Sequence, residues 1–255
     1  MRAFALPAAV ILSLCLYMPM PALEKKLPGM LKKLHSSVQT VLQNKQIDAR
    51  HAFPVTAALL VIVSALLSLV HPLLCAIIAA PLFPFSAVMP GCAKAKDELD
   101  SGKYARDIPA YEAIVRENCL LLAPAFARGF FAPLLLLSIG LPVHLGAALL
   151  YVYAALRALE GEYAPAKSIL SLIDRAADRI FSAMLMLCAG LVGRNPVRIH
   201  AKSAEERLIR TLGIAGDRTD THAPMSGDIA QGIFLCSFAG GLLTVMVTLV
   251  LLAVC

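Results

Sequence analysis

Residues 229–255 read IAQGIFLCSFAGGLLTVMVTLVLLAVC and contain no Lys, Arg, Asp or Glu. A helix of about 20 residues crosses the hydrocarbon core of a bilayer, so an uncharged apolar stretch of this length is typical of a transmembrane helix. Two further uncharged runs, 52–93 and 129–156, lie earlier in the chain. Together the three runs predict a protein that crosses a membrane several times.

The composition of the whole chain agrees with this prediction. Of its 255 residues, 59% are hydrophobic and 16% are charged, and the mean hydropathy is +0.75. Soluble domains carry charge on roughly a quarter of their residues, so a soluble enzyme, a disordered chain and a disulfide scaffold are excluded. We therefore expect a single all-α, polytopic membrane bundle of about five or six spans in the cell membrane, with amphipathic helical loops on the cytoplasmic side.

Most of the net charge of +6 comes from one segment, 23–50. An excess of Lys and Arg beside a span marks the cytoplasmic side of a membrane. Met30, Leu34 and Val38 recur there at helical spacing, which predicts a helix in the plane of the interface with anionic lipid headgroups as its partner. Because no aromatic side chains accompany the basic ones, we expect no nucleic acid as a partner. The basic residues are Lys25, Lys26, Lys32, Lys33, Lys45 and Arg50.

Prolines and glycines divide the apolar runs. His71-Pro72 lies near the middle of 52–93 and predicts a break in a helical hairpin, since proline lacks a backbone donor and disfavours helix at the preceding residue. Gly140-Leu-Pro142 offers a similar break in 129–156, which fits one long span or two half-length pieces. The expected segments are a first span or signal-like segment (1–22), a basic interfacial loop (23–50), a helical hairpin (52–93), a polar helical insert (94–128), a span (129–156), an amphipathic helix plus half-span (157–193), a polar loop (194–228) and the last span (229–255).

The ends of two polar helices can be placed from capping residues. Asp107 and Pro109 suit the first turn of a helix in the insert. Ser203 and Glu206 have the spacing of a capping box, and Gly213 suits the end of the same short helix. The seven cysteines show no C-x-x-C spacing, so we expect reduced packing residues and no metal site.

Several short elements follow one another in a particular order between residues 94 and 228. They are LDSG at 99–102, IVR at 114–116, GFFAPL at 129–134, the break at 140–142, Tyr151, the helix 168–180, AE at 204–205, LG at 212–213 and DI at 228–229. In this order the chain resembles the adenosylcobinamide-phosphate synthase family of cobalamin biosynthesis, the CobD/CbiB type. The resemblance covers about 135 residues and rests on collinearity.

The resemblance implies a corrinoid as a partner. Members of the family join adenosylcobyric acid to an aminopropanol phosphate in an ATP-driven amide synthesis, so ATP and Mg²⁺ are the implied cofactors if the activity is retained. Mg²⁺ takes oxygen ligands, chiefly carboxylates. This chain lacks several of the family's acidic residues: residues 124–128 read PAFAR where the family has Glu-Asn-x-x-Asp, and Leu170-Ser171 replaces a paired Asp.

The residues expected to contact phosphate or corrinoid side chains are Arg116, Glu117, Arg128, Glu205 and Asp228. The guanidinium group of arginine suits phosphate because it presents a fork of donors. No catalytic residue is assigned. Two other interpretations stay open: a non-catalytic membrane protein that keeps the fold and has lost the site, and a small-solute transporter that uses His71 and His144 beside broken helices.

Overall fold

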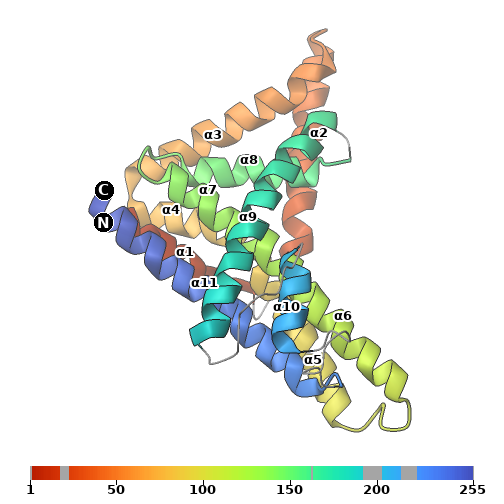
Figure 1. Ribbon diagram of the computed structural model, residues 1–255. Helices are drawn as coiled ribbons and strands as arrows, with labels where there is room; N and C mark the ends of the chain where they lie inside the picture. The colour runs from red at the N-terminus through yellow and green to blue at the C-terminus, as the bar shows by residue number, and fades with distance from the viewer. Residues whose placement is uncertain (1, 18–22, 162, 192–202, 214–222, 255) are drawn as a thin grey trace. The chain divides into compact units, whose positions relative to one another are not determined.

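The computed structural model describes residues 2–17, 23–161, 163–191, 203–213 and 223–254 (Figure 1). Within these ranges every regular element is a helix, which confirms the all-α prediction. The α-helices are α1 (Ala5–Tyr17), α2 (Leu23–Asn44), α3 (Ala52–Val70), α4 (Pro72–Ala79), α5 (Met89–Asp100), α6 (Ile108–Phe126), α7 (Ala132–Gly140), α8 (Gly146–Ala158), α9 (Ala164–Leu191), α10 (Ala204–Leu212) and α11 (Ser226–Val254). Short 3-10 helices lie at Arg2–Phe4, Ala49–His51, Ala80–Leu82 and Pro84–Val88, and a π-helical turn lies at Ala127–Phe131.

The chain forms two compact units, each made of several stretches of sequence. Unit 1 comprises Met1–Pro84, Ala132–Asp174 and Thr244–Cys255. Unit 2 comprises Phe85–Phe131 and Arg175–Leu243.

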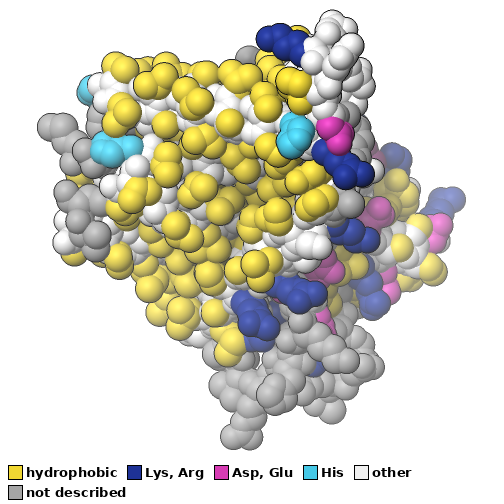
Figure 2. Space-filling model, turned by 90° about the horizontal axis from the view of Figure 1, so that it is seen from above, with side chains coloured by type: hydrophobic (Ala, Val, Ile, Leu, Met, Phe, Trp, Pro, Cys, Tyr) yellow, Lys and Arg dark blue, Asp and Glu magenta, His cyan; other side chains and the backbone are white. Residues whose placement is uncertain are grey.

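Three helical stretches in the described part of the chain are long and apolar enough to cross a membrane, namely Ala52–Val70, Ile108–Gly140 and Ser226–Ala253. The stretches Leu73–Leu82 and Pro84–Asp100 qualify as a fourth span only when taken together. Helices α1 and α8 are apolar but shorter, at 13 residues each. The outward side chains of α3 include Ile62, Leu66 and Val70, which are 57%, 60% and 74% exposed. Hydrophobic side chains cover much of the molecular face shown in Figure 2. These helices support a protein of the membrane and confirm the predicted last apolar helix.

The break predicted at His71-Pro72 is present. Helix α3 ends at Val70, His71 adopts an extended backbone conformation, and Pro72 is the first residue of α4. The imidazole Nδ1 of His71 accepts a hydrogen bond from the backbone N–H of Leu73 at 3.1 Å, so it satisfies a donor at the start of α4. Helix α4 then packs back against α3, as expected for a hairpin.

The expected boundary at Gly129 lies inside a continuous helix instead. Helix α6, the π turn and α7 form one apolar stretch of 33 residues from Ile108 to Gly140. Arg128 therefore does not end a polar insert, because a single charged side chain does not interrupt backbone hydrogen bonding. The run 129–156 divides at 140–142 into α7 and α8, the second of the two arrangements that the sequence allows.

Helix α9 joins the expected amphipathic helix and the apolar half-span into one element of 28 residues. Its buried side chains include Leu170, Phe181 and Leu185. Ile169 and Leu172, three residues apart on the same helix, are turned outward instead, at 44% and 71% exposed.

The predicted caps are confirmed. The Ser203 hydroxyl accepts a hydrogen bond from the N–H of Glu206 at 3.2 Å, α10 spans Ala204–Leu212, and Gly213 ends it with a φ of 77°. This positive φ favours glycine. The Asp107 carboxylate likewise accepts from the N–H of Ala110 at 3.0 Å at the start of α6.

In unit 1, α1 packs against α4, and α8 packs against α3 and α7. The hydroxyl of the buried Tyr17 donates to the carbonyl of Pro81, which ties the end of α1 to the segment after α4. Residues 18–22, where a signal-like segment would be cut, lie outside the described residues.

Unit 2 has an aromatic core. The rings of Phe85, Phe126, Phe130, Phe131 and Phe181 form successive contacts with centroids 4.6 to 6.4 Å apart. The described cysteines are all free, and the buried ones in this unit are Cys92, Cys119, Cys188 and Cys236. They behave as the packing residues that the sequence predicts.

Two neighbouring glycines of α11 give a matched pair for a stability test. A Cβ at Gly240 would lie 2.9 Å from the ring of Phe130, whereas a Cβ at Gly241 would meet nothing within 4 Å. We expect Gly240→Ala to lower the free energy of unfolding by about 1–2 kcal/mol through overpacking. Gly241→Ala should raise it by up to about 1 kcal/mol, because alanine is the better helix former. Thermal unfolding of both variants in detergent checks this, and equal effects would contradict the packing of Gly240 on Phe130.

Candidate functional site

The charged residues expected at a ligand site all lie in unit 2. Arg116 and Glu117 are exposed on α6, and Arg128 is exposed in the π turn. Consecutive residues of a helix point about 100° apart, so Arg116 and Glu117 lie on adjacent sides of α6. Arg116 and Arg128 are about 18 Å apart along the helix axis at 1.5 Å per residue.

Glu205 and Asp228 differ in their surroundings. Glu205 is exposed on the first turn of α10. Asp228 is only 4% exposed, and its carboxylate accepts the N–H of Met225 at 2.8 Å while its own N–H donates to the carbonyl of Met225 at 2.9 Å. Asp228 therefore caps the start of α11 and positions that helix.

Two contacts bring these elements together within unit 2. Helix α10, which carries Glu205, packs against α6, which carries Arg116 and Glu117. The N–H of Ser226 donates to the hydroxyl of Tyr111 at 2.9 Å, and this bond joins the start of α11 to the first turn of α6. Residues far apart in sequence thus share one structural unit.

At the end of α5 and in the turn after it, oppositely charged side chains form ion pairs with one another. Lys96 lies 2.5 Å from Asp100, and Lys103 lies 2.7 Å from Glu98. The hydrogen bond to Glu98 raises the pKa of the Lys103 ammonium group. Since these opposite charges neutralise one another, this end of the insert offers little net charge to a charged ligand.

Among the described residues, no group of three or more His, Cys, Asp or Glu side chains is placed to hold a metal ion. Mg²⁺ bound with ATP takes one or two carboxylates together with the phosphates.

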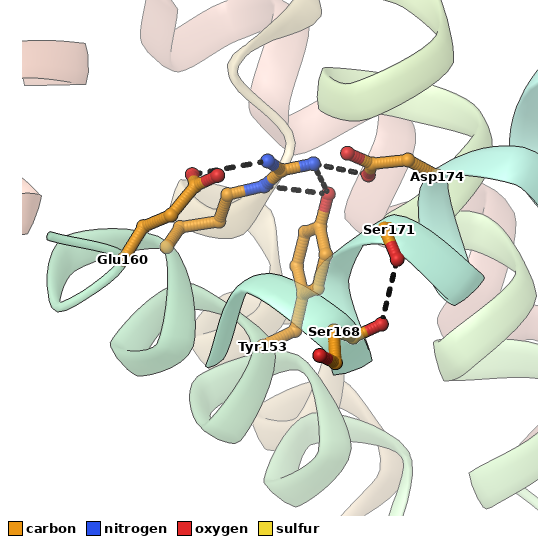
Figure 3. A network of polar contacts seen from close by, with 6 residues as sticks. Tyr153, Glu160, Ser168, Ser171 and Asp174 are labelled. Carbon is orange, nitrogen blue, oxygen red and sulfur yellow. Dashed lines mark hydrogen bonds and ion pairs between the residues drawn. The ribbon is translucent and has the colours of Figure 1, made fainter. Parts of the chain in front are cut away.

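A polar network that the sequence analysis missed lies in unit 1, around Arg157 at the end of α8 (Figure 3). Its Nε and Nη2 donate to the hydroxyl of Tyr153 at 3.2 and 3.0 Å, and Nη2 also donates to the carboxylate of Asp174. Its Nη1 lies 3.5 Å from Oε2 of Glu160. All three guanidinium nitrogens thus contact groups of the protein itself.

This network ties α8 to α9. Asp174 belongs to α9, and the side chains of Arg157 and Asp174 are each 22% exposed. Two serines of α9 are drawn beside it in Figure 3, and the hydroxyl of Ser171 donates to the carbonyl of Ser168 at 2.8 Å. Because the donors of Arg157 are occupied from three directions, the geometry is that of a cross-link between helices.

One signal in the sequence points to this network. Arg157 is the first charged residue after the uncharged run 129–156, and Tyr153 lies one turn before it. Side chains four residues apart on a helix are neighbours. Asp174 comes from another helix, so its part in the network could not be read from spacing.

The two histidines considered for a transporter have local roles. His71 caps α4, as described above. His144 has a positive φ of 61° in the turn between α7 and α8, where its N–H donates to the carbonyl of Leu141 at 3.2 Å.

Comparison of the chain with protein-family models, with curated proteins and with solved structures finds no significant match.

Proposed function

We propose that this chain is a multi-pass membrane protein of cobalamin biosynthesis that binds a corrinoid through unit 2. The observation that carries the proposal is the common location of Arg116, Glu117, Arg128 and Glu205 in this unit. The collinear resemblance to the synthase family selects the corrinoid among anionic ligands.

The proposed contacts follow from the chemistry of the exposed side chains. A corrinoid intermediate with an aminopropanol phosphate carries a dianion and a ring of amide side chains. One of Arg116 and Arg128 would bind the phosphate, since the guanidinium fork matches its oxygens. The other, about 18 Å away along the helix axis, would donate to amide carbonyl oxygens of the ring side chains. Glu117 and Glu205 would accept hydrogen bonds from the amides. Asp228 would position α11.

The membrane arrangement in this proposal uses more than the three long helices. Five or six spans result if two or three of α1, the broken stretch around Pro84, α8 and the apolar end of α9 insert in addition to them. The protein would lie in the cell membrane with its polar helices in the cytoplasm.

The dispersed carboxylates favour a second candidate, a non-catalytic membrane protein that keeps the helical scaffold of the family. Its supporting observation is the lack of a metal-holding group among the described residues. The two candidates differ in whether a corrinoid binds at all.

The site is tested with adenosylcobinamide phosphate, which has both the corrin ring and the phosphate. We expect Arg116→Gln combined with Arg128→Gln to weaken its binding by about tenfold or more, because hydrogen bonds to charged groups contribute about 1.5–3 kcal/mol. Equilibrium dialysis of the purified protein, read by visible absorbance, measures the dissociation constant.

Arg106→Gln is the matched control, since Arg106 is an exposed arginine of the same unit. It should leave the dissociation constant within about twofold. If Arg106→Gln weakens binding as much as the double variant does, the effect comes from net charge alone and the assigned site is wrong. Amide formed by wild-type protein from adenosylcobyric acid, aminopropanol phosphate, ATP and Mg²⁺ would overturn the non-catalytic candidate.

A further inference from the structure

Helix α2 divides its apolar side chains between two faces. Leu31 and Leu42 are buried, at 7% and 9% exposed. Met30 and Val41 are 66% and 55% exposed, and Leu34 is 36% exposed. Residues 30, 34 and 41 are separated by four and seven positions, so they form one stripe along the helix.

The buried face holds α2 in unit 1. The helix packs against α3 and α8, and His35 Nδ1 lies 3.3 Å from the hydroxyl of Thr56 near the start of α3. Figure 1 shows α2 and α3 diverging from their short connection.

The exposed stripe has a basic border. Lys26 and Lys33 are seven residues apart and therefore lie on the same side of α2, next to the stripe of Met30, Leu34 and Val41. Both lysines are exposed. A long lysine side chain can cover apolar surface with its methylene groups while its ammonium group reaches the headgroups.

We propose that this stripe, formed by Met30, Leu34 and Val41, is a docking surface for anionic lipid. The apolar side chains enter the boundary of the acyl chains, and Lys26 and Lys33 bind the phosphates of anionic headgroups. The adjacent helix supports a lipid occupant, because α3 is itself apolar enough to span the bilayer. The inference is independent of any corrinoid.

The absence of tryptophan from this chain makes the insertion directly measurable. Leu34→Trp places one fluorophore in the stripe, and Ser36→Trp places one at an exposed position about 200° around the helix. Both full-length variants are reconstituted in vesicles of phosphatidylcholine with phosphatidylglycerol. We expect bromine on the acyl chains to quench the tryptophan at position 34 at least about twofold more than that at position 36.

The preference for anionic lipid is tested by moving the bromine between lipids. Brominated phosphatidylglycerol should quench the tryptophan at 34 more strongly than an equal fraction of brominated phosphatidylcholine. Adding Lys26→Gln and Lys33→Gln should remove this difference and leave the insertion itself. Equal quenching of the tryptophans at 34 and 36 would overturn the proposed docking surface. Protection of the tryptophan at 34 from both acyl-chain bromine and aqueous iodide would overturn it too, because protein would then cover this position. An unchanged lipid preference in the lysine variant would overturn the role of the two lysines.

Discussion

Alanine at position 140 is expected to give a protein that unfolds about 10 °C below the wild type. A Cβ on Gly140 would lie 2.6 Å from both the N and the Cα atoms of Gly146 across the turn between α7 and α8. These are backbone atoms and cannot turn aside as a side chain can. The turn must therefore open, at a cost of about 3 kcal/mol or more. For a chain of this size, 1 kcal/mol corresponds to roughly 2–4 °C.

The measurement is thermal unfolding in detergent with a thiol-reactive dye. It suits this protein because the described cysteines other than Cys15 are buried and become reactive on unfolding. Gly161→Ala is the control, since a Cβ at Gly161 meets nothing within 4 Å. A Gly140→Ala variant as stable as this control would show that α7 and α8 do not meet as closely as Gly140 and Gly146 do here.

Removing the carboxylate of Asp174 is expected to lower the free energy of unfolding by about 2–3 kcal/mol. The loss arises because Arg157 keeps its charge in a position where only 22% of its side chain is exposed. The midpoint of thermal unfolding should fall by about 4–10 °C. The same dye assay measures it, and Asp97→Ala, at an exposed position of α5, should change the midpoint little.

A double variant separates the loss of the pair from the unpaired charge. Arg157→Met with Asp174→Leu replaces both partners by apolar groups, which is often neutral when both charges are removed together. We expect it to recover most of the stability lost in Asp174→Ala. A double variant less stable than Asp174→Ala would contradict this explanation, because Arg157 would then stabilise the protein through groups other than Asp174.

The parts of the fold that could be predicted from sequence are those fixed by local chemistry. The Ser203 cap, the positive φ of Gly213 and the break at His71-Pro72 each depend on a few consecutive residues, and each is present. The last apolar helix follows from composition alone.

The parts that were missed depend on contacts between distant residues. Arg128 marks a change in composition, yet the helix continues through it, so the polar insert and the following span could not be separated there. The interaction of Arg157 with Asp174 joins residues of two helices that are 17 positions apart in the sequence. The capping bond from the N–H of Met225 to Asp228 was also missed, and the expected contact of Asp228 with a ligand stays a prediction.

The candidate site stays a prediction. Arg116, Glu117, Arg128 and Glu205 share unit 2 and are exposed, as binding residues must be. Arg116 and Arg128 lie about 18 Å apart along the helix, so one small anion cannot bridge them. A ligand with the breadth of a corrin ring and its phosphate arm is the kind that could contact both.

Titration of the wild-type protein with adenosylcobinamide phosphate in lipid nanodiscs tests the corrinoid proposal most directly. The proposal predicts saturable binding that reaches one corrinoid per chain, detected by visible absorbance of the retained ligand. Uptake that rises without saturation and equals that of protein-free nanodiscs would contradict it.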